Sequence, residues 1–133
     1  MELPHGATDD DQREQVRAIL NLLRPYGPRF QTDLPAVDDA PPAVIDARAI
    51  LLAAEGTKGD SEYATTSLID SDDDRLWESF VQAAPYAFSA ELWQEGDYLV
   101  SLADEGQSVV VYLVPDSDLQ TVVAERFDLR SLG

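Results

Sequence analysis

The stretch AFSAELWQEGDYLVSLADEGQSVVVYLV, residues 87–114, decides the fold expected of this chain. Apolar side chains alternate with polar ones in much of residues 87–94 and 97–103, and short Gly-containing segments follow each run. Alternating runs joined by short turns are typical of antiparallel strands. Residues 109–114 are apolar on both faces, which favours a central or doubly covered strand. The sequence therefore predicts a three-stranded antiparallel meander.

The alternation also assigns side chains of the meander to faces. Glu91 and Trp93 share one face of the first strand. If a helix covers that face, Trp93 belongs to the core; if water covers it, Trp93 is an anchor for a binding partner. The apolar third strand favours the covered arrangement. Two further sets should each share a face, namely Phe88, Ala90 and Leu92 in the first strand and Tyr98, Val100 and Leu102 in the second.

Helices are expected to cover this sheet. Apolar residues recur at helical spacing, and Asp runs precede several of these segments, where they can cap a helix. Asp70 or Ser71 should cap the third helix, and the second helix is apolar around most of its circumference, which predicts burial on more than one side. Prolines and aspartates mark residues 26–42 as a loop. The expected helices are residues 8–24, 42–55, 72–84 and a last one that begins within residues 115–118.

The resulting order predicts one α+β domain over residues 1–133. Its sheet is a three- to four-stranded antiparallel meander covered by about four helices, and residues 62–69 are either the fourth, edge strand or an extended loop. The chain has 133 residues, of which 44% are hydrophobic, enough for one core without disulfides. Residues 1–7, which include the only histidine, His5, are predicted to be a disordered lead.

Acidic residues dominate the composition. The chain carries 26 acidic and 9 basic residues, a net charge of −17. Residues 60–133 hold 16 acids and 3 bases, so that this half alone has a net charge of −13. Such a field disfavours direct binding to nucleic acid or to an anionic membrane and favours a basic protein surface. A high-salt cytoplasm or a GC-rich genome explains the same bias without any partner, and both explanations stay open.

Several chemical classes have little support in the sequence. The chain has no Cys, which excludes thiolate chemistry and disulfides. Asp70, Asp72 and Asp74 resemble the start of an EF-hand loop, but Arg75 stands where that loop needs Gly and Val81 where it needs Glu. These acids are better explained as a helix N-terminus, and no cofactor is predicted. The N-terminus lacks the features of a signal peptide and no run is long enough to span a membrane, so we expect a cytoplasmic protein.

We therefore expect a non-enzymatic acidic protein that occludes a basic partner, as inhibitors and immunity-type proteins do. A small homodimeric chaperone or adaptor is the alternative, and a carboxylate-based metal-dependent enzyme is a third possibility. An aromatic side chain among acids at strand ends and turns is suited to bind Lys and Arg of a target. The expected partner-binding residues are Glu91, Trp93, Glu95, Asp97, Asp104 and Glu105.

Overall fold

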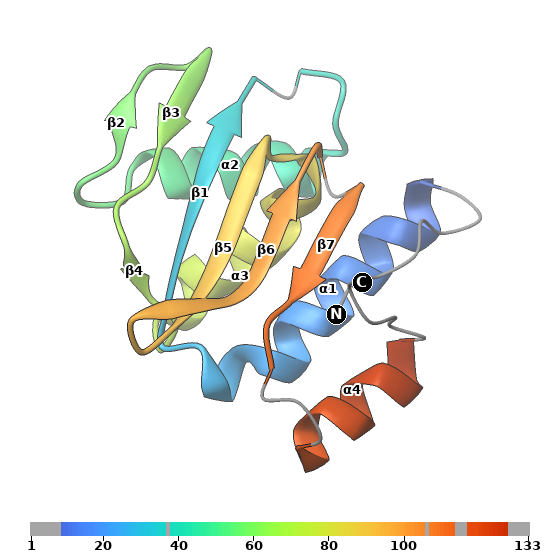
Figure 1. The fold of residues 1–133 in the computed structure, drawn as a ribbon. Coiled ribbons are helices and arrows are strands. Elements are labelled where there is room, and N and C mark those ends of the chain that lie inside the picture. Colours follow the sequence, from blue (N-terminus) through green and yellow to red (C-terminus); the bar gives the residue numbers. More distant parts are fainter. Residues whose placement is uncertain (1–8, 37, 106, 114–116, 128–133) are drawn as a thin grey trace.

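The computed structural model describes residues 9–36, 38–105, 107–113 and 117–127, which form an α+β fold of four α-helices and seven strands. Figure 1 shows their arrangement. In chain order, the elements are α1 (Asp9–Leu23), the 3-10 helix η1 (Arg24–Tyr26), β1 (Arg29–Pro35), α2 (Pro42–Leu52), β2 (Lys58–Gly59), β3 (Tyr63–Thr65), β4 (Ile69–Asp70), α3 (Asp74–Ala83), the 3-10 helix η2 (Ala84–Tyr86), β5 (Ser89–Gln94), β6 (Asp97–Ala103), β7 (Ser108–Val111) and α4 (Asp118–Phe127).

The strands form one antiparallel sheet in the order β2-β3-β1-β5-β6-β7, and β4 also pairs with β1. The predicted meander is present as β5, β6 and β7. The expected count of three to four strands was too low, because residues 62–69 contribute β3 and the start of β4, and β1 and β2 were not foreseen.

Strand β1 corrects the prediction that residues 26–42 form a loop. Phe30, Thr32 and Leu34 are buried, and the residues between them are more exposed, which is the alternation of a half-covered strand. Pro28 precedes the strand and Pro35 ends it, so neither interrupts its hydrogen bonding from within. The prolines that suggested a loop therefore mark the two ends of a central strand.

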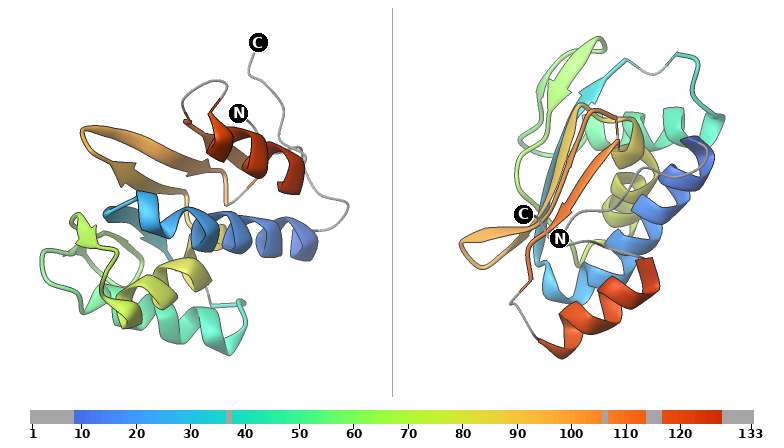
Figure 2. Two further views of the ribbon diagram at one scale, coloured as in Figure 1. Left: turned by 90° about the horizontal axis from the view of Figure 1, so that it is seen from below. Right: turned by 45° about the vertical axis from the view of Figure 1, so that its right-hand side comes forward.

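Helices α1, α2 and α3 lie on one side of the sheet (Figures 1 and 2), and α4 lies beside α1. Four residues of α1 at helical spacing are fully buried, as the sequence predicted: Val16, Ile19, Leu20 and Leu23. Trp77 of α3 is also core, with 1% of its surface exposed. None of the helices in the described ranges has the length and apolar character needed to cross a lipid bilayer.

Three further expectations are corrected. Helix α2 is buried on one side only, since Ile45 is 41% exposed. The cap of α3 is Asp73, whose Oδ1 accepts the Leu76 N–H at 3.0 Å, and not Asp70 or Ser71, because β4 keeps the chain extended before the helix. Strand β7 is the last strand in the sheet order and not a central one. His5 and the predicted disordered lead lie outside the described residues.

Arg48 fastens α2 to the sheet. Its side chain is buried, and its Nε donates to the Pro35 carbonyl at 2.6 Å. Its Nη2 donates to the carbonyls of Leu34 at 3.0 Å and of Ser61 at 2.8 Å. One guanidinium thus joins α2, the end of β1 and the segment before β3. Hydrogen bonds from a charged donor are stronger than neutral ones, and removal of the guanidinium takes this donor from one buried and two partly buried bonds.

Arg48→Met should therefore lower the free energy of unfolding by about 3 kcal/mol, because methionine fills much of the space but donates to none of the three carbonyls. Urea denaturation monitored by tryptophan fluorescence measures the change. Arg75→Met is the matched control, since Arg75 is exposed on α3 and its replacement should change stability little. Equal losses in the two variants would contradict this account of Arg48.

Candidate functional site

The sheet face turned away from α1, α2 and α3 is named the open face, because no helix or strand in the described part of the chain covers it. The alternation of buried and more exposed residues along β1, β5 and β7 assigns side chains to it. Its side chains include Arg29, Gln31, Asp33, Tyr63, Thr65, Ser89, Glu91, Trp93, Tyr98, Ser101, Val110 and Tyr112.

A β-bulge creates an aromatic row on this face. Leu92 pairs with Val100 and Trp93 with Tyr98, so Leu99 is the extra residue of β6. The bulge turns Tyr98 to the open face, where its ring centroid lies 4.3 Å from that of Trp93 and 6.2 Å from that of Tyr112. The prediction that Tyr98 shares a face with Val100 is therefore wrong. Strict alternation cannot reveal an extra residue, and Tyr98 was missed as a site residue for this reason. Tyr112 was missed because residues 109–114 were treated as apolar on both faces.

Trp93 lies on the open face and not in a helix-covered core, contrary to the preferred interpretation of the sequence. It is half-buried against its neighbours on the sheet, and its Nε1 is buried with no hydrogen-bond acceptor among the described residues. Tyr98 and Tyr112 remain 38% and 41% exposed. The three rings, here called the aromatic row, present a large apolar surface to whatever meets this face.

Glu91 lies beside the aromatic row, in the middle of the sheet. It stands opposite Gln31 of β1 and Ser101 of β6, and its side chain is half-buried. Burial raises the pKa of the Glu91 carboxyl, and the negative charge of Asp33 raises it further. No ion pair or hydrogen bond to this carboxylate is found within the described ranges. Glu91 is thus a partly desolvated charge without a counter-charge among the described residues.

Asp33, which the loop prediction concealed, differs from Glu91 because its carboxylate is already hydrogen-bonded. Its Oδ1 accepts from the Thr65 hydroxyl at 2.9 Å, and its Oδ2 accepts from the Ser89 hydroxyl at 2.8 Å. A hydrogen bond to Asp33 is also the main reason that the pKa of Tyr63 is raised. Asp33 therefore links β1 to β3 and to β5. The Glu91 carboxylate makes no such link among the described residues and can accept hydrogen bonds from a partner.

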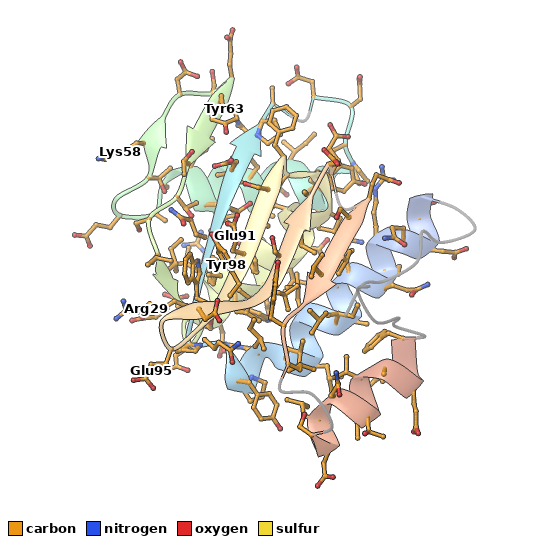
Figure 3. All side chains as sticks on the ribbon, viewed as in Figure 1. Arg29, Lys58, Tyr63, Glu91, Glu95 and Tyr98 are labelled. Atoms are coloured by element: carbon orange, nitrogen blue, oxygen red, sulfur yellow. The ribbon has the colours of Figure 1, made fainter. Side chains whose placement is uncertain are left out.

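Positive charges lie at the margin of the open face. Figure 3 shows Arg29 and Lys58 pointing outward at one side of the sheet, while Glu91 and Tyr98 lie over its middle. The Arg29 side chain is 60% exposed, and its Nε lies 3.6 Å from Asp70 Oδ1. The centre of the face is therefore negative and aromatic, with its two nearby cations to one side.

The remaining predicted site residues fall into two groups at opposite ends of β6. Glu95 and Asp97 are exposed in the β5–β6 turn, next to the aromatic row. Asp104 and Glu105 are exposed in the turn before β7. A seven-residue strand separates its ends by about 20 Å, so the six residues do not form one cluster. Glu105 instead borders an open hollow of about 430 Å³, whose lining includes Asp38, Asp39, Tyr86 and Phe88.

No group of three or more His, Asp or Glu side chains within the described ranges is arranged to hold a metal ion. No protein-family model matches this chain, and no similar protein was found among curated proteins or solved structures.

The raised pKa of Glu91 has a consequence for stability. A carboxyl whose pKa is higher in the folded than in the unfolded state favours folding below the unfolded pKa and loses that contribution as the pH rises through the folded pKa. Glu91→Gln, which keeps the shape without the charge, should therefore be more stable than the wild type at pH 7. Thermal unfolding between pH 3 and 8 measures the difference, which should vanish at the acidic end. A gain at acidic pH equal to that at pH 7 would contradict it, and the exposed Glu95→Gln serves as control.

The turn before β7 is strained. Asp104 and Glu105 have φ angles of 54° and 57°. These angles lie in the left-handed region, which is unfavourable for residues other than Gly. Glu105→Gly should relieve this cost and raise the free energy of unfolding by about 1 kcal/mol in chemical denaturation. Glu95→Gly in the other turn is the control, because Glu95 does not have a positive φ and gains nothing from Gly. Equal effects in both turns would refute the explanation.

Proposed function

We propose that this chain is a non-enzymatic acidic binding protein whose open face occludes a basic surface of another protein, as an inhibitor or immunity-type protein does. One observation carries the proposal: a sheet face that no described element covers joins the aromatic row to the Glu91 carboxylate, which has no ion pair among the described residues. Aromatic anchors beside complementary charge are a common composition of protein interfaces.

The aromatic row supplies the apolar part of such an interface. Tyr and Trp side chains have few rotatable bonds, so they lose little entropy when a partner immobilises them. Trp93 already rests against Tyr98, which orders both rings before any partner arrives. Burial of these rings on binding supplies affinity that charge alone does not.

The acidic charge supplies steering and selectivity. With a net charge of −17, the chain attracts a basic protein over a distance comparable to the Debye length, and it repels acidic ones. Glu95 and Asp97 in the exposed turn beside the aromatic row are placed to act during this approach. Rim charges of this kind affect the association rate and its dependence on salt more than they affect the final affinity.

A homodimer formed through the open face would be electrostatically less favourable than a complex with a basic partner. In a two-fold symmetric contact each residue near the axis meets its own copy or a neighbour of it. Two open faces in contact would bring two negative centres together, and like charges across an interface cost free energy. The proposal of a basic, different partner avoids this repulsion.

Affinity capture with variants of the open face tests the proposal. The wild type should retain a basic protein from native lysate at low salt and release it as ionic strength rises. Trp93→Ala/Tyr98→Ala should lose that protein, because the variant removes the two stacked rings of the face. Quantitative mass spectrometry measures the retained amount.

Ile45→Ala/Val122→Ala is the matched control, since these two side chains are 41% and 52% exposed on helices α2 and α4. It should retain the protein as the wild type does. Equal loss from both double variants, or equal retention by both, would contradict the proposed role of the open face. If light scattering instead shows a dimer that only the Trp93→Ala/Tyr98→Ala variant dissociates, the adaptor alternative replaces the proposal.

A further inference from the structure

We infer that Glu91 is the docking point for an arginine side chain of the partner, whose guanidinium pairs with the Glu91 carboxylate and lies against the aromatic row. This inference rests on the proposed function and specifies the chemistry of its partner. Three observations support it. Glu91 is half-buried, no described cation pairs with it, and hydrogen-bond acceptors and aromatic rings lie beside it.

The position of Glu91 in the sheet strengthens the interaction of its carboxylate with a cation. It lies on β5, near the middle of the strand order, and it is half-buried where the acids of the two hairpin turns are exposed. A partly desolvated carboxylate interacts more strongly with a cation than a fully hydrated one does. The burial that raises the pKa of Glu91 therefore also strengthens its attraction to a counter-charge.

Neither cation at the margin neutralises Glu91. Arg29 stands opposite Trp93 and is thus diagonal to Glu91, and its Nε faces Asp70 at 3.6 Å. Lys58 lies on β2, three strands from β5, or about 14 Å away at ordinary strand spacing. The matching cation must therefore come from outside the described part of the chain.

The surroundings favour a guanidinium over an ammonium group. The Gln31 amide nitrogen donates to the Thr66 carbonyl at 3.1 Å, which leaves its amide oxygen as an acceptor on the strand beside Glu91. The Ser101 hydroxyl provides another acceptor on the strand at the other side. A guanidinium has five donors in one plane, so it can pair with a carboxylate and still reach further acceptors. It also stacks on aromatic rings such as those of Trp93 and Tyr98.

Peptide titration tests this inference without the natural partner. Isotope-labelled protein is titrated at low salt with acetyl-Gly-Arg-Gly-amide, with the Lys peptide and with the neutral citrulline peptide, and NMR shifts are followed. The Arg peptide should shift signals of Glu91, Trp93 and Tyr98 in a saturable way, the Lys peptide should bind several-fold more weakly, and the citrulline peptide should not bind. The Glu91→Gln variant should bind the Arg peptide with an affinity about tenfold lower than that of the wild type.

Glu95→Gln is the control, because it makes the same chemical change in the exposed turn and should alter peptide affinity less than about twofold. Equal Arg and Lys affinities, shifts spread over acids far from the open face such as Asp72, or unchanged affinity in Glu91→Gln would overturn the inference. Partner capture that depends on Trp93 and Tyr98 but not on Glu91 would refute this inference alone. Peptide binding without any captured basic protein would instead count against the proposed function.

Discussion

The structure depends on one aromatic contact between the sheet and its helices. The Phe30 ring of β1 stacks on Phe80 of α3, with centroids 4.3 Å apart, and meets Trp77 edge-on at 5.9 Å. All three side chains are almost fully buried, and Trp77 Nε1 donates to Asn21 Oδ1 of α1 at 2.9 Å. Because β1 pairs with β3, β4 and β5, this contact attaches the whole sheet to one layer of helices. The same alternation that places Phe30 inward places Asp33 on the opposite, open face.

Local patterns were sufficient to predict much of this fold. Amphipathic spacing identified the buried stripe of α1 and the core position of Trp77, and alternation identified the β5–β6–β7 meander. The patterns failed where tertiary pairing decides the outcome. Strand β1 follows one proline, ends at another and contains an aspartate, and only its neighbours on both sides make it a central strand. The apolar β7 lies at the edge, since strand order is a property of the whole sheet.

The candidate site was partly predictable for the same reason. Glu91 and Trp93 share the open face because their two-residue spacing in a strand requires it. Tyr98 joins them only through the extra residue Leu99, which no alternation pattern reveals. Asp104 and Glu105 lie apart from Glu95 and Asp97, because the two turns of the meander are at opposite ends of β6.

Acidic residues of this chain differ in whether an arginine pairs with them. On the helical layer and its junctions, Arg13 pairs with Asp10, Arg17 with Glu14 and Arg24 with Asp74. Each of these pairs contributes little to stability, since its acid is largely exposed. The Arg29–Asp70 pair at the margin of the open face is of the same kind, whereas the half-buried Glu91 has no such pair within the described ranges. Exposed acids are sufficient for solubility, which therefore does not require a half-buried carboxylate. A partner that supplies a cation to this face would favour one, because a partly desolvated carboxylate interacts more strongly with a counter-charge than a hydrated one does.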